Sequence, residues 1–271
     1  QARAVLSTIA NKLMGTQLDD DTMIIGTSGR YEFKNKGINV YLEALNRLTR
    51  DKNLKKDVLA FINVPGWVGE VREDLRERLD SGKDYDTPLE CPFITHWLHN
   101  MSHDQVLDML KYLNMSNSVD TKVKVVFVPC YLDGKDGILN ELYYDLLIGT
   151  DLSVYPSYYE PWGYTPLESI AFKVPTITTD LAGFGLWVNS LTGKNATLQD
   201  GVKVIHRTDY NYSEVADTIK DTISEFSSLT STEINKIRKN AANIAEKALW
   251  KHFIQYYYEA YDIALRNAAK R

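Results

Sequence analysis

Cysteine is scarce in this sequence: Cys91 and Cys130 are the only two among 271 residues. Two isolated thiols are too few for a disulfide framework or a Cys-based zinc site, and they suit a reducing compartment. We therefore expect a cytoplasmic protein. The length and the 44% share of hydrophobic residues are sufficient for one large α/β domain or two smaller ones.

Excess positive charge and long apolar runs are also lacking. The formal net charge of -5 provides no broad positive field for nucleic acid or an anionic membrane, so any bound anion must be held by local groups. No apolar run approaches the length of a membrane span, and the first residues lack the apolar core of a signal peptide. We therefore predict neither a nucleic-acid partner nor a membrane partner.

Strand and helix patterns alternate along most of the chain. Short apolar runs predict six buried strands, at 22–29, 57–64, 122–129, 151–157, 174–180 and 201–207. Helical periodicity precedes the first run and separates the first five, but no helix is predicted between the fifth and the sixth. The alternation predicts an α/β fold with a doubly wound parallel sheet, in which ligands bind outside the carboxyl ends of the strands. We predict a single domain over 1–271, with a helical insertion at about 65–120 and a C-terminal helical segment at about 213–271.

A first anion site is predicted where the first strand turns into a helix. The segment 26–37 contains two glycine turns together with Arg30, Lys34 and Lys36. Cations at a helix start are mildly unfavourable unless an anion is bound there. We assign Arg30 and Lys36 to phosphate binding and treat Lys34 as solvated. Neither the GxxxxGK[ST] nor the GxGxxG pattern is present, which disfavours a nucleotide hydrolase.

Two glutamates flank the second candidate loop, EPWGYTPLE at 160–168. Glu160 lies among aromatic side chains beyond the fourth strand, where a carboxylate can accept hydrogen bonds from sugar hydroxyls. The amides of Gly163, Tyr164 and Thr165 lead into a helix and can contact a phosphate. Glu168 can bind a diol such as a ribose, but it also fits a capping box in which Thr165 is the N-cap.

No metal site is predicted. The three acidic residues at 19–21 precede a strand instead of following one, which is typical of a solvated acidic turn. His96, His99 and His103 give no helical i, i+4 pair followed by a suitable acid, although His99 and His103 are four residues apart.

Several of these segments together resemble the glycogen synthases of the fungal and animal type, which are retaining glycosyltransferases of the two-domain GT-B fold. The resemblance rests on SGRYEFKNKG, EPWGYTPLE and PTITTDLAGFG, with support from CPFITHWL, KVKVVFVPCYL and ALWKHF. It implies that the chain is the Rossmann-like C-terminal, donor-binding half of such an enzyme. The implied donor is the nucleotide sugar UDP-glucose, without a cofactor, and the implied acceptor is an α-1,4-glucan.

The resemblance also implies roles for individual residues. Arg30 and Lys36 match the pair that holds the donor diphosphate, and Glu160 matches the glutamate near the donor sugar. Glu168 matches the residue near the donor ribose. The remaining matches are the phosphate-binding turn and the aromatic that stacks on the donor base, which are Gly163, Tyr164, Thr165 and Tyr143.

The resemblance implies that this chain contains only the second domain of such an enzyme, whereas the first domain carries part of the acceptor site. We therefore expect weak nucleotide binding and little or no turnover from this chain alone. A non-catalytic module that binds a nucleotide sugar or a glucan remains an alternative, and the donor base stays open between uracil and adenine. Glu160 is expected to orient the sugar, although a covalent nucleophile is also conceivable.

Regulation is expected to differ from that of the eukaryotic enzymes. In the family that the chain resembles, the eukaryotic enzymes have an arginine cluster near the C-terminal helices that senses glucose 6-phosphate. The matching segment here contains only Lys236, Arg238 and Lys239. We expect that response to be absent or altered.

Overall fold

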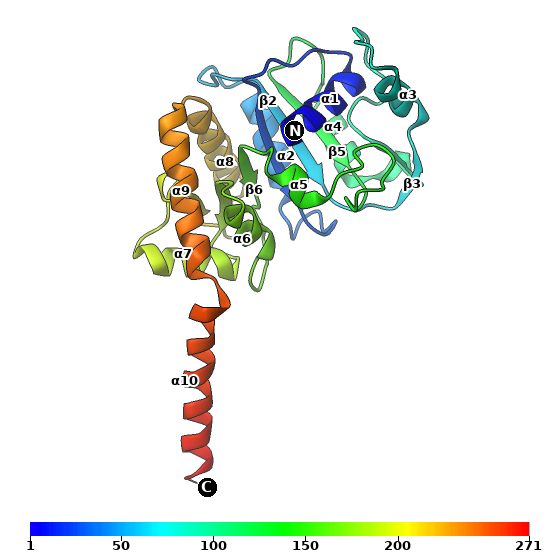
Figure 1. Cartoon of the computed structure of the whole chain (residues 1–271). Helices are drawn as coiled ribbons and strands as arrows, with labels where there is room; N and C mark the ends of the chain where they lie inside the picture. Colours follow the sequence, from blue (N-terminus) through cyan, green and yellow to red (C-terminus); the bar gives the residue numbers. More distant parts are fainter. Residues whose placement is uncertain (271) are drawn as a thin grey trace.

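A six-stranded parallel sheet forms the centre of the protein, a computed structural model that describes residues 1–270 (Figure 1). Its strands are β1 (Met23–Ser28), β2 (Val58–Asn63), β5 (Val123–Val128), β6 (Leu152–Val154), β7 (Thr176–Thr179) and β8 (Val202–Ile205). Their order is β5-β2-β1-β6-β7-β8, so the chain winds outward in one direction from β1 and in the other from β6. The predicted doubly wound α/β sheet and all six predicted strands are confirmed.

Helices cover both faces of the sheet. They are α1 (Ala2–Met14), α2 (Ile38–Leu48), α5 (Tyr143–Leu147), α6 (Tyr164–Ala171), α7 (Gly183–Thr192), α8 (Tyr212–Ser227) and α9 (Ser231–Lys247). Successive side chains of β1 alternate between the two layers: Ile25 lies in the cluster with α2 and α8, whereas Ile24 lies in the cluster with α1. A strand that is buried on both faces has a continuous apolar run in its sequence, and this run is why β1 could be predicted.

Helix α7 has no counterpart among the predicted elements. Its first turn contains Gly183 and Gly185, and glycine is among the poorest helix formers. Both glycines are required by close packing, because a Cβ at Gly183 would lie 2.2 Å from the carbonyl oxygen of Pro161. Tertiary contact therefore determines this helix against its local propensity.

The insertion at 65–120 is helical only in part, so that prediction was incomplete. It contains α3 (Glu73–Ser81), a 3-10 turn (Met101–His103) and α4 (Gln105–Tyr112), but also β3 (Val68–Val71) and β4 (His96–Leu98). These two short strands pair antiparallel in a separate sheet. Strands of three or four residues that pair across a long connection carry little periodic signal of their own.

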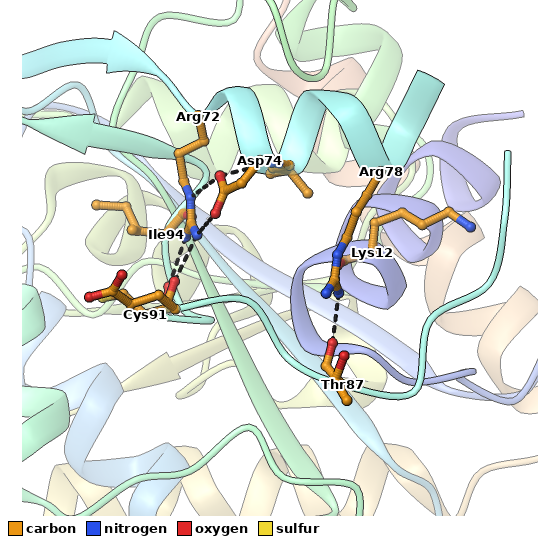
Figure 2. Close-up of polar contacts among 9 residues, drawn as sticks. Lys12, Arg72, Asp74, Arg78, Thr87, Cys91 and Ile94 are labelled. Atoms are coloured by element: carbon orange, nitrogen blue, oxygen red, sulfur yellow. Dashed lines mark hydrogen bonds and ion pairs between the residues drawn. The ribbon is translucent and has the colours of Figure 1, made fainter. Parts of the chain in front are cut away.

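Arg72 holds this insertion together (Figure 2). Its side chain is completely buried and forms a two-pronged contact with the Asp74 carboxylate, at 3.0 and 2.6 Å. The same guanidinium donates to the backbone carbonyls of Glu90, Cys91 and Ile94, at 2.7 to 3.1 Å. The planar guanidinium thus joins the start of α3 to the segment that leads into β4.

Helix α10 (Trp250–Ala268) projects away from the rest of the molecule (Figure 1). None of its side chains is buried, and Tyr257, Tyr261 and Leu265 are all exposed. Their four-residue spacing predicts a packing stripe on one helix face, and this stays a prediction because nothing within residues 1–270 covers them. Among the same residues, no helix is both long enough and apolar enough to cross a membrane.

Replacing Arg72 should destabilise the fold strongly. We expect Arg72→Met to lower the free energy of unfolding by about 3 to 5 kcal/mol, because it leaves buried carbonyls without a donor. Urea denaturation followed by circular dichroism measures this change. Arg76→Met is the matched control, because Arg76 forms a largely exposed pair with Glu73 and should contribute less than about 1 kcal/mol. Equal losses in the two variants would contradict the role given to Arg72.

Candidate functional site

A cavity of about 620 Å³, lined by both apolar and polar side chains, lies outside the carboxyl ends of β1, β2 and β5. This is the edge of a doubly wound sheet at which ligands bind. Its lining comes from segments distant in sequence: Ser28, Gly29, Arg30, Tyr31, Asn63, Pro65, Cys130, Tyr131, Leu132, Asp133, Tyr143, Thr165 and Glu168. Four of the predicted site residues, Arg30, Tyr143, Thr165 and Glu168, therefore line one cavity.

Lys36 and Glu160, predicted for separate loops, form an ion pair with each other. Their side chains are only 14% and 17% exposed. The Lys36 amide donates to the Glu32 carbonyl at 2.8 Å, which fixes the first loop. The backbone of Glu160 is anchored to the following loop, because its carbonyl accepts from the amide of Gly183 at 3.1 Å. Two backbone anchors thus hold opposite charges at the point where the two loops meet.

Arg30 behaves differently from Lys36. Its side chain is 77% exposed and forms a surface ion pair with Glu32 at 3.0 Å. Lys36 approaches the cavity lining through its hydrocarbon stem, which passes close to Gly29. The two cations predicted to bind phosphate therefore lie on the same loop, Lys36 in a largely buried ion pair and Arg30 in a largely exposed one.

The start of α6 differs from the prediction, because Thr165 is not its N-cap. Gly163, with a φ of 111°, takes the N-cap position, the helix begins at Tyr164, and no side chain caps it. Glycine tolerates this backbone angle, which lets the chain enter the helix two residues earlier. The predicted capping box is therefore wrong, and Glu168 lies further inside the helix. Its carboxylate lines the cavity, and the pKa of Tyr144 is raised by burial and by a hydrogen bond to Glu168.

Two tyrosines that line the cavity differ in burial and in hydrogen bonding. The hydroxyl of Tyr143 is 2.6 Å from Ser28 Oγ and 3.4 Å from the hydroxyl of Tyr155, and burial raises the pKa of Tyr143. Tyr131 lines the same cavity but is 77% exposed. Sequence reasoning missed Tyr131, although its place directly after a buried strand could have indicated it.

Three groups with metal-binding chemistry lie close together, namely His96, Asp136 and the cavity-lining Cys130. His99 and His103 are not part of this cluster. Both ring nitrogens of His96 have partners, since Nδ1 lies 2.9 Å from Thr95 Oγ1 and Nε2 lies 2.8 Å from the Asp136 carbonyl oxygen. Burial lowers the pKa of His96, and burial together with nearby aspartates raises the pKa of Cys130 to about 12. The Asp136 carboxylate accepts from three backbone amides of its own loop, at 2.7 to 3.0 Å, so the polar atoms of His96 and Asp136 already have partners within the protein.

The sheet order and the cavity at its strand ends define a doubly wound α/β domain with a candidate ligand cavity. The family profile described as Glycogen synthase matches residues 74–270, and the chain belongs to this family. This confirms the resemblance inferred from the motifs.

Individual relatives agree with this assignment. The chain is 27% identical over 307 residues to glycogen [starch] synthase isoform 2 of Saccharomyces cerevisiae. This alignment covers 92% of this chain and 44% of the yeast protein. It is likewise 27% identical to the glycogen [starch] synthases of Neurospora crassa and Caenorhabditis elegans, again over 92% of this chain. The chain thus spans less than half the length of these relatives and corresponds to their C-terminal part.

A solved structure was also found, that of WaaG, a glycosyltransferase involved in lipopolysaccharide biosynthesis. It aligns with a TM-score of 0.45 and 15% identity, covering 84% of this chain and 44% of that one.

Gly37 controls how the two loops meet, and its replacement should be harmful. It has a φ of 70°, and an added Cβ would lie 2.0 Å from the carbonyl oxygen of Pro156. We expect Gly37→Ala to destabilise the fold by about 1 to 2 kcal/mol through backbone strain, and by about 1 to 3 kcal/mol more through this clash. Gly82→Ala is the control, because φ is 64° and nothing lies within 4 Å of the added Cβ. Urea unfolding that gives equal losses would contradict the clash.

Proposed function

We propose that this chain is the donor-binding part of a retaining glucosyltransferase, which binds UDP-glucose for transfer to the non-reducing end of an α-1,4-glucan. The observation that carries the proposal is the Lys36–Glu160 pair beside a cavity that also presents Arg30 and Glu168. This set supplies cations for a diphosphate and carboxylates for hydroxyls. Membership of the glycogen synthase family supports the choice of reaction.

In this proposal the main chemical task is to stabilise the departing diphosphate. The bond between the anomeric carbon and the phosphate oxygen breaks, the electron pair stays on the phosphate, and the sugar becomes cationic. Lys36, Arg30 and the amides at the start of α6 would stabilise the negative charge as it grows. No metal is needed for this step as we propose it.

Glu160 would act on the sugar instead of on the phosphate. Its carboxylate is held by Lys36 and by backbone anchors, which suits a residue that orients hydroxyls and favours the cationic sugar. The acceptor hydroxyl would then attack the anomeric carbon from the side of the leaving group, and its proton would pass to the departing phosphate. A glucosyl ester trapped on Glu160 would instead indicate the covalent route.

Two tyrosines are available for the donor base. Tyr143 is the residue expected from the sequence, but its hydroxyl is tied to Ser28. We propose that Tyr131 shares this role, because its exposed ring lines the same cavity. Glu168 of α6, which lines the same cavity, is proposed to bind the ribose.

The complete reaction is proposed for a longer protein. The glucan acceptor would be shared with the part of the relatives that lies outside the aligned region, and the isolated chain should bind donor while turning over little. A cytoplasmic location is proposed from the two free cysteines.

Calorimetric titration with UDP and with ADP tests the proposal. We expect saturable binding of UDP, and an Arg30→Ala, Lys36→Ala double variant should bind at least about tenfold more weakly, because charge-assisted hydrogen bonds to phosphate are lost. Lys34→Ala is the matched control: Lys34 is exposed on the same loop and should change the affinity less than about twofold.

Other outcomes of the titration separate the alternatives. Preference for ADP would keep the fold and the anion site but change the donor. Binding that weakens equally in Lys34→Ala would contradict a specific role for Arg30 and Lys36. The same titration can be made on a two-domain protein of the length of the relatives. If that protein binds UDP equally well with and without the double substitution, the donor site itself is contradicted.

A further inference from the structure

A second, smaller cavity of about 280 Å³ adjoins the donor cavity. Tyr31 lines both of them. The segment between β2 and β3 also connects the two, because Pro65 lines the donor cavity while Trp67 lines the smaller one. The smaller cavity belongs to the insertion at 65–120, to which the proposed function assigns no task.

Trp67 gives this cavity an open aromatic wall. The residue is 73% exposed, although a tryptophan this large is usually well buried. Its ring packs against His99, with ring centroids 5.0 Å apart, and its carbonyl accepts from the amide of His99 at 3.1 Å. The indole is therefore held in place from one side while remaining accessible to a ligand, which is the state of a preformed platform.

The floor of the cavity is rigid and electrostatically satisfied. Asp104 is buried; one carboxylate oxygen accepts from the Tyr31 hydroxyl at 2.6 Å, and the other accepts from the amide of Leu107 at 2.9 Å, capping α4. The Tyr31 hydroxyl also accepts from the amide of Val106 at 3.1 Å. This network ties the cavity to the first anion loop, because Tyr31 directly follows Arg30.

The rim is polar but carries no cation of the lysine or arginine type. Asn100, His103 and Gln105 surround the opening. Among the described residues, the side chains of His103 and Gln105 form no hydrogen bond, so amide and imidazole groups remain available to a ligand. The lining lacks the cations that a phosphate would need, which disfavours a second nucleotide.

We propose that this cavity is a saccharide subsite that binds a pyranose ring of a linear glucan. A neutral sugar offers an apolar C–H face for Trp67 and a ring of hydroxyls for Asn100, His103 and Gln105. The inference rests on the proposed function and deepens it, because it places part of the acceptor polymer on this chain, next to the donor cavity. Holding the polymer there would raise its effective concentration near the donor.

Maltoheptaose binding by the full 271-residue chain tests this subsite. We expect measurable binding by calorimetry, and Trp67→Ala should weaken it by about tenfold or more, because the aromatic anchor carries most of such a contact. Trp250→Ala is the matched control, since Trp250 is also exposed but lies at the start of α10. The affinity of this variant for maltoheptaose should stay within about twofold of that of the unmodified chain.

UDP titration of the same samples separates this inference from the donor site. Trp67→Ala should bind UDP as the unmodified chain does, which also shows that the variant is folded. Absence of maltoheptaose binding by the unmodified chain, or equal binding by the Trp67→Ala variant, would overturn the subsite while leaving the donor proposal intact. Equal weakening by Trp67→Ala and Trp250→Ala would overturn it as well, since that result indicates a diffuse aromatic contribution.

Discussion

The carboxylate of Asp151 fixes the point at which the two halves of the sheet meet. It accepts from the backbone amide of Ile24 at 2.9 Å, while the amide of Asp151 donates to the Ile24 carbonyl at 2.7 Å. It also pairs with Arg3 of α1 at 2.6 Å and with Arg238 of α9 at 3.4 Å. The register between β1 and β6 spans only two residue pairs, so this charged anchor supplements a short ladder. The loops that follow β1 and β6 meet only because these strands are neighbours.

Most of the sheet could be predicted from the sequence because its strands are buried on both faces. Such strands appear as apolar runs without alternation, and the helices between them establish a parallel order. The predictions failed where tertiary contact overrides local preference. Helix α7 starts with glycines that close packing requires, β3 and β4 depend on the buried Arg72, and the capping motif at Thr165 is displaced because Gly163 turns the chain earlier.

The candidate site was predictable residue by residue but not as an assembly. Local motifs identified Arg30, Lys36, Glu160 and Glu168, since each lies at a strand end or a helix start. No local rule relates Lys36 to Glu160, which are 124 residues apart in the chain. The sheet order alone brings them together, and it turns two separate predictions into one ion pair. Arg238 illustrates the converse: considered by sequence for an effector site, it is engaged here by Asp151.

The Lys36–Glu160 pair bears on selectivity for the proposed donor. With a net charge of -5, the chain does not attract anions generally, so the affinity must come from local cations. A free phosphate could draw Lys36 away, but it would leave the largely buried Glu160 carboxylate without a partner, which is unfavourable. The proposed nucleotide sugar would bring a diphosphate for Lys36 and hydroxyls for Glu160 together. In this proposal the ion pair opposes ligands that satisfy only one of its members, because they leave the other charge unpaired.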